Sequence, residues 1–375
     1  MATTTIDLNN PLSMKVWSKK IMAEVSKATS IAPLIGVGKN NIIELKEEIQ
    51  KGAGDTVSFG LRMQLSGGGV SENEILEGHE ESLTLCSDSL RIGELAHAVR
   101  IRNEGTIDQQ RIPYSLRNEA KESLVDWYAD RLALTAFIHF CGYTGNSLPG
   151  RPDRIMSSQG VYTGFNTPKA PSSNRIIYPN NKFSEATLDK KDYFTLKLID
   201  RAVEMAKLAN PAIRPVRIGG DNAYVLYLHP SQVTSLRSNT ETGQWLDIQK
   251  SAYNGSRRNN PIFDGSLGMY NGVILRESPY ITPGLTDLGE QIPQVRRAVL
   301  LGAQAGVIAF GQNQSATRFK LVEELFDYQR ELGIAAKTLI GMKKTSFTSS
   351  REHTGGEQER QDFATIVIPT YVEAR

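Results

Sequence analysis

Apolar and polar residues alternate along the chain from Asp55 to Leu65, and this alternation predicts a β-strand with two different faces. One face carries five apolar side chains: Val57, Phe59, Leu61, Met63 and Leu65. A glycine-rich, acidic loop follows from Ser66 to Glu81, and a second extended arm covers Ser82 to Arg102. This order predicts a long hairpin with a loop at its tip.

The apolar phase of the second arm slips along its length. Leu83 and Leu85 fall on one face of an extended chain, whereas Leu90 and Ile92 fall on the other. A shift of this kind is typical of an extra residue in one strand, so we expect a bulge or bend around Asp88.

A long amphipathic helix is predicted to follow the hairpin, from Pro113 to Cys141. Its apolar residues form a stripe at helical spacing: Leu116, Ala120, Leu124, Trp127, Leu134 and Ile138. Proline is tolerated in a first helical turn, and Gly142 is typical of the position just past a helix. Such a helix would be on the order of 40 Å long at 1.5 Å per residue. A hairpin that leads into a helix of this length indicates a protein that reaches across to a neighbour.

The segments outside this core predict a mixture of arms, loops, helices and strands. Residues 1–50 form an arm with helical spacing from Pro11 to Ser30, whose basic side is either a solvated face or a surface toward a neighbour or nucleic acid. Residues 145–189 are rich in Pro, Ser, Asn and Gly and predict surface loops with short strands.

Further elements are predicted in the second half of the chain. Helices are expected over Asp192–Leu208, Ser231–Arg237 and Thr242–Tyr253. Strands are expected over Ala223–Leu228, Tyr270–Leu275, Val295–Phe310 and Phe363–Tyr371, with a turn at Gly333 before an apolar run at Ile334–Ile340.

The loop of the hairpin is strongly acidic. Its carboxylates are Glu72, Glu74, Glu77, Glu80 and Glu81, and no Lys or Arg occurs between Met63 and Leu90. The loop either serves solubility or docks on a basic patch of the next subunit. The candidate patches are Arg100 with Arg102, Arg257 with Arg258, and Arg296 with Arg297. The sequence does not choose among them.

Composition sets broad limits on function. The 375 residues are 39% hydrophobic and 22% charged, and the net charge of +2 is too balanced to indicate nucleic-acid binding by bulk charge. Cys86 and Cys141 match no zinc spacing and are expected to be buried or half-buried thiols in a reducing compartment. The N-terminus resembles no signal peptide and no apolar run predicts a membrane span, so we expect a cytoplasmic protein, at least until assembly.

Catalytic chemistry finds no support in the pattern of reactive residues. The five histidines are scattered without metal-ligand spacing, and no nucleophile elbow, P-loop or dinucleotide fingerprint occurs. Paired carboxylates such as Glu323 and Glu324 are adjacent, so they point apart in a strand. We therefore nominate no catalytic, cofactor-binding or metal-binding residue, and we expect no cofactor.

The order of hairpin and long helix resembles the extended loop and spine helix of tailed-phage major capsid proteins with the Hong Kong 97 fold. Later stretches are similar to the axial domain and returning strands of that fold: Asp192–Leu208, Tyr224–Pro230, Phe263–Val273 and Asp327–Phe347. Short motifs further resemble the N-four-like podovirus major capsid family: Gly54-Asp55-Thr56-Val57, Leu76-Glu77-Gly78 and Glu80-Glu81.

The resemblance implies an α+β capsid fold with five parts. They are an N-terminal arm (1–50), an extended hairpin loop (51–105), a spine helix and peripheral domain with a loop insertion (106–190), an axial domain (191–315) and C-terminal strands that return to the peripheral domain (316–375). It also implies self-assembly into pentamers and hexamers of an icosahedral shell in the virion, around double-stranded DNA that is bound without sequence specificity. Scaffolding, portal and decoration proteins are the implied partners, assembly takes place in the host cytoplasm, and no membrane is involved.

Two other interpretations of the sequence stay open. One is a soluble α/β enzyme or ligand-binding protein with an unrecognised site, because catalytic groups can assemble from distant residues. The other is a different shell or virion component, such as a portal or the shell protein of an encapsulating nanocompartment, which shares the fold.

Overall fold

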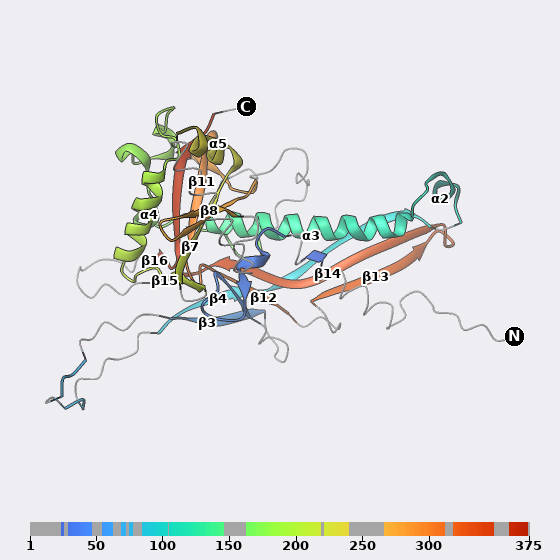
Figure 1. Cartoon of the computed structure of the whole chain (residues 1–375). Coiled ribbons are helices and arrows are strands. Elements are labelled where there is room, and N and C mark those ends of the chain that lie inside the picture. The colour runs from blue at the N-terminus through green and yellow to red at the C-terminus, as the bar shows by residue number, and fades with distance from the viewer. Residues whose placement is uncertain are drawn as a thin grey trace.

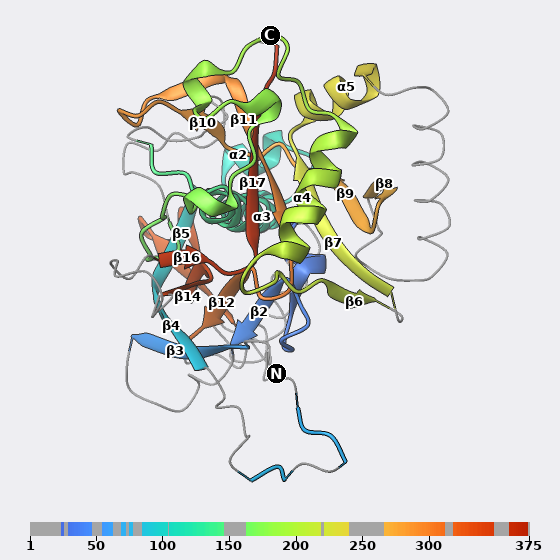
Figure 2. The same cartoon turned by 90° about the vertical axis from the view of Figure 1, so that its left-hand side faces the viewer.

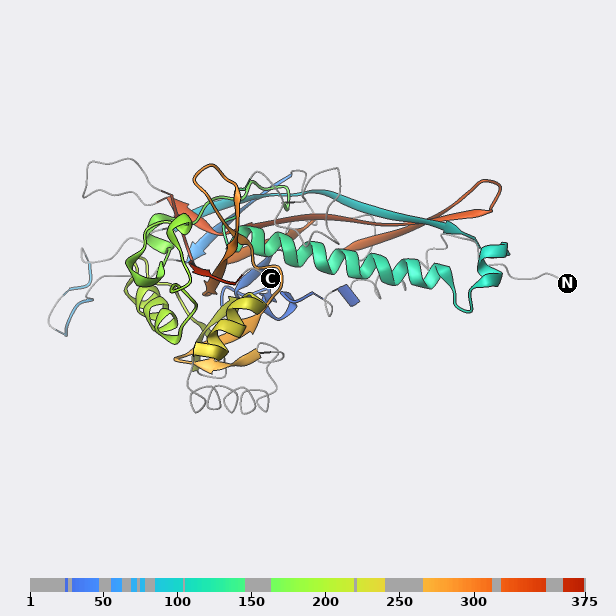
Figure 3. The ribbon, with the colours of Figure 1, turned by 90° about the horizontal axis from the view of Figure 1, so that it is seen from above.

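The structure is a computed structural model of the chain. It describes residues 24–25, 29–46, 55–62, 69–72, 75–77, 85–103, 105–145, 163–218, 221–239, 266–311, 318–348 and 360–373. The described part is elongated: a body of sheets and short helices lies at one end, and a narrow extension that contains the longest helix and long strands projects from it (Figures 1 and 3).

The described helices are few and one of them dominates. They are α2 (Ile107–Arg111), α3 (Leu116–Phe140), α4 (Leu196–Leu208) and α5 (Pro230–Asn239), together with the 3₁₀ helices η1 (Ala32–Leu34), η3 (Ser173–Arg175), η4 (Pro179–Asn181) and η5 (Glu185–Thr187). At 25 residues, α3 is about 38 Å long at 1.5 Å per residue.

A six-stranded mixed sheet runs along the extension beneath α3. Its strands follow the order β1 (Ile35–Gly36), β2 (Ile43–Lys46), β12 (Gly306–Phe310), β14 (Glu331–Lys344) and β13 (Phe319–Phe326), with β5 (Gly93–Arg102) also paired to β14. Alternate residues of β14 are buried from Leu332 to Ile340, as expected for a strand with one covered face. The Tyr128 hydroxyl of α3 donates a hydrogen bond to the Ala336 carbonyl of β14 at 2.6 Å.

A seven-stranded sheet forms the body. Its order is β10 (Pro283–Leu285), β11 (Gln291–Leu301), β7 (Asp221–Leu228), β9 (Val273–Glu277) and β8 (Ser266–Tyr270), with β17 (Thr365–Tyr371) on β11 and β6 (Val216–Ile218) on β7. Its central strands read as continuous apolar runs because both faces are covered. Residues 131–140 of α3 are buried all round, and Figure 2 shows the helix end-on in the middle of the molecule.

The predicted hairpin is confirmed at its root. Strand β3 (Thr56–Arg62) pairs antiparallel with β4 (Leu85–Arg91), and Val57, Phe59 and Leu61 are buried on one face. The predicted bulge or bend around Asp88 is not found at that residue, because the pairing is regular through Phe59 and Asp88. Cys86, Asp88 and Leu90 all lie opposite the apolar face of β3, so the inward face of β4 includes a carboxylate.

The second arm of the hairpin is divided between two sheets. Strand β4 stays with β3, whereas β5 leaves it after Ile92 and pairs with β14 from Gly93↔Ile340 to Arg102↔Glu331. The crossing is tight, because a Cβ on Gly341 would collide with the carbonyl oxygen of Arg91. The structure therefore places a bend at Ile92.

Several predicted boundaries shift for identifiable reasons. The long helix begins after an extended N-cap at Ser115, so Pro113 lies outside it. Helix α4 begins at Leu196 and not at Asp192, because the Asp192 carboxylate accepts hydrogen bonds from Asp189 N and Asn180 Nδ2 at 2.9 and 2.8 Å.

The remaining predictions of strands are confirmed in part. The expected strand Tyr270–Leu275 is a hairpin that turns at Asn271 and Gly272, both with positive φ. The expected turn at Gly333 is wrong, since that residue lies inside β14 and the turn is at residues 327–330. The expected strand Val295–Phe310 covers β11 and β12, which belong to different sheets. Within described residues 163–189, loops and 3₁₀ turns replace the expected short strands apart from one bridge.

Two expectations concern segments that are wholly or mostly outside the described residues: the helix Thr242–Tyr253 and the arm helix Pro11–Ser30. Among the described helices, none has the length and apolar character needed to cross a bilayer. Both cysteines are free thiols, with Cys86 half-buried and Cys141 buried, which confirms the burial expected for them.

The buried end of α3 predicts a loss of stability in acid. Burial lowers the pKa of His139 from 6.5 to about 4, although its Nε2 donates a hydrogen bond to Thr163 O at 2.8 Å. The unfolded chain therefore takes up a proton more readily than the folded chain below pH 6.5, so stability falls as the pH drops toward about 4. The total loss from this group is expected to be about 3 kcal/mol.

Urea unfolding of the dilute, unassembled subunit between pH 7 and pH 4 measures this effect. The His139→Gln variant retains a donor for Thr163 O but does not titrate, so its stability should fall less steeply with acid. Equal pH slopes for the two proteins would contradict a neutral, buried His139.

Candidate inter-subunit surfaces

A half-buried carboxylate fixes the root of the β3–β4 hairpin to the body. Asp88 Oδ1 accepts from Lys343 Nζ at 2.5 Å, and its Oδ2 accepts from the backbone N and the Oγ of Ser346 at 3.2 Å each. The side chains of Asp88 and Lys343 are 13% and 12% exposed. Charge-assisted hydrogen bonds of this kind are strong and directional, so the carboxylate ties β4 to β14 and β15 (Ser346–Thr348).

An asparagine holds the bend itself. The backbone N of Arg91 donates to Asn166 Oδ1 at 3.0 Å, and Asn166 Nδ2 donates back to Arg91 O at 3.0 Å. The same amide lies 3.3 Å from Met342 O of β14. The Asn166 side chain thus makes the hydrogen bonds that a neighbouring strand would make where the chain passes from β4 into β5. These bonds give the hairpin a defined direction.

The tip of the hairpin combines carboxylates with exposed apolar side chains. Glu72 and Glu77 are exposed, and between them Ile75 and Leu76 are 75% and 61% exposed. Figures 1 and 2 show these residues well away from the body. The other acidic candidates, Glu74, Glu80 and Glu81, lie outside the described residues.

The first basic candidate is already ion-paired within the chain. Arg100 Nε lies 2.5 Å from Glu331, and Arg102 lies 3.3 Å from Glu331 and 3.8 Å from Asp108. These arginines lie on β5 toward the end of the extension, far from the hairpin tip of the same copy (Figure 1). The second candidate, Arg257 with Arg258, lies outside the described residues.

The third candidate patch is Arg296 with Arg297. The prediction that Arg297 forms part of an exposed docking patch is wrong, because Arg297 is buried. Its Nε and Nη2 lie 2.7 and 2.9 Å from the two carboxylate oxygens of Glu185, and its Nη1 donates to Gly142 O at 3.0 Å. The two side chains are 8% and 7% exposed, so this guanidinium serves the interior and does not offer a docking patch.

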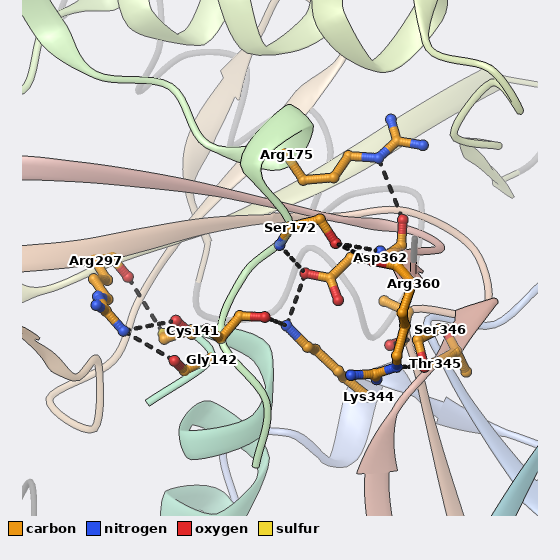
Figure 4. A network of polar contacts seen from close by, with 12 residues as sticks. Cys141, Gly142, Ser172, Arg175, Arg297, Lys344, Thr345, Ser346, Arg360 and Asp362 are labelled. Atoms are coloured by element: carbon orange, nitrogen blue, oxygen red, sulfur yellow. Dashed lines mark hydrogen bonds and ion pairs between the residues drawn. The ribbon is translucent and has the colours of Figure 1, made fainter. Parts of the chain in front are cut away.

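A second buried ion pair, drawn in Figure 4, joins the end of β14 in the six-stranded sheet to the short strand that comes before β17. Lys344 Nζ at the end of β14 lies 2.7 Å from Asp362 Oδ2 on β16 (Arg360–Asp362), and each side chain is 1% exposed. Ser172 brackets Asp362, because Ser172 N donates to its carboxylate at 3.2 Å and Ser172 Oγ accepts from its backbone N at 2.8 Å. Arg175 Nε donates to Asp362 O at 3.2 Å. Burial lowers the pKa of Lys344, and the Asp362 carboxylate opposes that shift.

No pattern in the sequence predicted this network of polar contacts. Lys344 and Asp362 lie in β segments that read as ordinary strands, and Ser172 and Arg175 lie in a stretch that reads as surface loop. Lys344 falls on the same face of the strand as the apolar residues Ile340 and Met342, and a lysine at such a position could have indicated a buried partner.

Apolar side chains are also exposed at the far end of the extension. Tyr328 is 99% exposed in the β13–β14 turn, where Asp327, Tyr328 and Gln329 all have positive φ. Ile107, the first residue of α2, and Tyr114, which follows that helix, are 58% and 55% exposed. This end is a second candidate contact surface, which the sequence analysis missed because it placed the turn at Gly333.

The described titratable groups serve packing and structure. His97 stacks on Trp127 with ring centroids 4.2 Å apart, and His229 Nδ1 accepts from Ser231 N at 3.2 Å. Glu323 is bound by Lys121 at 2.7 Å and by Arg117 at 2.5 Å, whereas Glu324 points to solvent. Within the described ranges, no three His, Cys, Asp or Glu side chains gather as a metal site would require.

Comparison with known proteins agrees with this geometry. The family described as phage capsid protein matches residues 5–374. The chain belongs to the phage capsid protein family. It is 25% identical over 379 residues to the major capsid protein of Pseudomonas phage KPP25, across 96% of this chain and 94% of that protein.

Solved capsid structures share the fold of this capsid protein. The capsid of Ralstonia phage GP4 superposes with a TM-score of 0.78 at 28% identity, over 100% of this chain and 99% of that chain. The capsid of cyanophage Pam1 has a TM-score of 0.61 at 20% identity, over 92% and 93% of the two chains. The predicted α+β capsid fold of the Hong Kong 97 type is confirmed, and membership of the N-four-like group stays a prediction.

The buried Lys344–Asp362 pair predicts a large penalty when one partner is removed. Asp362→Ala leaves a buried ammonium unpaired and should lower the free energy of unfolding by about 3–5 kcal/mol. The double variant Lys344→Met, Asp362→Leu removes both charges and should recover a substantial part of that loss.

Urea unfolding of the unassembled capsid protein compares these variants. Arg111→Ala, which breaks an exposed ion pair with Asp108, is the control and should cost less than about 1 kcal/mol. If Asp362→Ala were no more costly than Arg111→Ala, the pair would not be buried in solution.

Proposed function

We propose that this chain is the major capsid protein of a tailed bacteriophage and that it assembles into pentamers and hexamers of an icosahedral shell. The shell would enclose double-stranded DNA without sequence-specific contacts. The observation that carries the proposal is the β3–β4 hairpin, which is fixed at its root and carries exposed apolar and acidic residues at its tip.

A two-stranded hairpin is marginally stable when nothing covers it. The chain nevertheless keeps one at a defined angle through Asp88 and Asn166. Such a projection gains stability when it lies on a second copy. A contact between one surface and a different surface of the next copy closes into rings when the rotation allows it.

The division into domains is part of the proposal. The spine helix and six-stranded sheet would form the peripheral domain, with residues 106–190 and 316–375 as its main segments. Residues 191–315 would form the axial domain. Two strands cross these boundaries, because β12 joins the six-stranded sheet and β17 joins the seven-stranded sheet. The two domains would therefore move together as subunits dock.

Further partners follow from the same proposal. A shell of this kind meets scaffolding, portal and decoration proteins, and it forms in the host cytoplasm before it becomes part of the virion. The nearly neutral net charge of +2 suits a wall that surrounds DNA without binding it tightly. Among the described residues, no side-chain cluster favours the enzyme interpretation.

Negative-stain electron microscopy with light scattering tests the proposal directly. The purified chain is expected to form closed shells, tubes or five- and six-fold rings as its concentration rises. A subunit that stays monomeric or dimeric at high concentration and with a crowding agent would contradict self-assembly.

The acidic loop allows a test at the level of residues. Changing Glu77, Glu80 and Glu81 to Lys should leave the monomer folded, because the described member of the set is exposed, but should block or misdirect assembly. The isosteric change of the same residues to Gln removes charge without reversing it and should have a weaker effect. Circular dichroism checks folding, and electron microscopy counts shells. Normal shells from the Lys variant would exclude electrostatic docking of the loop.

A further inference from the structure

A basic hollow of about 360 Å³ lies on the body, beside the C-terminal part of α4. Its apolar lining includes Val203 of α4 and Pro215, which precedes β6. Its polar lining includes Lys207 of α4, Asn222 of β7, and Arg214, which precedes β6. The hollow thus has an apolar wall with hydrogen-bond donors around it.

The charges of this hollow have one sign. Lys207 and Arg214 line it, and no carboxylate is among its lining residues. The Arg214 guanidinium is oriented from behind, because its Nη2 donates to Gln304 Oε1 at 2.6 Å. Asn271 is also in the lining, and its Nδ2 donates a hydrogen bond to Asp200 Oδ1 at 2.9 Å. Asp200 itself is not among the lining residues. Arg217 of the adjacent strand β6 is exposed and adds a further cation.

The hairpin tip has the complementary character. Glu72 and Glu77 provide carboxylates, and Ile75 and Leu76 are exposed apolar side chains between them. The tip of the same copy points away from the body, so a contact with this hollow involves a second copy (Figures 1 and 2). The arginine pairs nominated from sequence are less suited, since Arg297 is buried and Arg100 and Arg102 already bind carboxylates.

We propose that the hollow lined by Lys207, Arg214 and Val203 receives the hairpin tip of a neighbouring copy. Ile75 or Leu76 would enter against Val203 and Pro215, while Glu72 and Glu77 would lie opposite Lys207 and Arg214. The inference rests on the proposed shell and names the surface that the hairpin contacts. Two carboxylates with an apolar side chain between them match the hollow better than a phosphate does. A phosphate could pair with the two cations but has no apolar group to pack against the apolar wall.

A disulfide trap measures whether the two surfaces meet. Leu76→Cys and Asn222→Cys are introduced into one chain, which is assembled and then oxidised. A disulfide forms only when the two Cα atoms come within about 7 Å. Because each copy would carry one tip and one hollow, the expected product is a covalent ladder that ends at pentamers and hexamers on a denaturing gel.

Two controls make the trap specific. The wild-type chain contains Cys86 and Cys141, and it should give no ladder under the same oxidation. Leu76→Cys with Lys197→Cys places the second thiol on an exposed residue of α4 outside the hollow, and it should also give none.

The outcomes separate this inference from the shell itself. Shells with a ladder only for the Leu76–Asn222 pair support the docking site. Shells without that ladder overturn the docking site and leave the capsid function standing. Absence of any assembly by the wild-type chain overturns both.

A charge exchange gives an independent readout. Lys207→Glu should reduce the yield of shells by about tenfold, and adding Glu77→Lys in the same chain should restore most of it. Lys197→Glu changes the same helix by the same charge outside the hollow and should have little effect. If Lys207→Glu instead abolishes binding of a DNA duplex by the subunit while the trap gives no ladder, the hollow is a phosphate site and the proposal is wrong.

Discussion

The buried ion pair between Lys344 and Asp362 is the interaction on which the arrangement of the two sheets depends. Lys344 ends β14 of the six-stranded sheet, and Asp362 ends β16, the short strand that comes before β17 of the seven-stranded sheet. Removing two charges from water costs several kcal/mol per ion, and only close geometry with further hydrogen bonds offsets that cost. Ser172 N donates to the Asp362 carboxylate and Arg175 Nε donates to the backbone carbonyl of Asp362, so the residue that pairs with Lys344 is held in one position. A junction of this type gives a defined angle where apolar packing alone would allow several.

The pair formed by Arg297 and Glu185 plays the same part at the end of the spine helix. Arg297 Nη1 lies 3.4 and 3.0 Å from the carbonyl oxygens of Cys141 and Gly142, just past α3. The last carbonyls of a helix have no partners within it and carry partial negative charge, so a buried cation there is favourable. The helix is thereby fixed at its buried end. Because it is long, a small change of angle at this end would move Tyr328 at the far end by a much larger distance.

Sequence periodicity predicted the elements whose faces differ in exposure. The alternation in β3 and the helical stripe of α3 follow directly from one buried and one open face, and the order of hairpin and helix indicated the fold. The pattern failed where a polar residue takes an inward position, as Asp88 does in β4. It also failed at Gly333, where glycine lies within a strand, while the true turn uses residues with side chains. The ion pairs of the junction join residues far apart in sequence, and no local pattern carries that information. The acidic tip could be recognised in the sequence, but the basic surface proposed to bind it could not. Tertiary contacts bury Arg297 against Glu185 and leave Lys207 exposed, and no local pattern shows this.

The distribution of stability along the chain suits assembly by many modest contacts. The junction holds a buried ion pair, whereas among the described strands each strand of the β3–β4 hairpin pairs only with the other. A projection that is stable alone would gain little from a neighbour, and one without an anchored root would lose much of the binding free energy in conformational entropy. Anchoring the root through Asp88 and Asn166 while leaving the tip uncovered avoids both extremes. Each contact can then stay weak enough to form and correct reversibly, and symmetry multiplies it into a closed assembly.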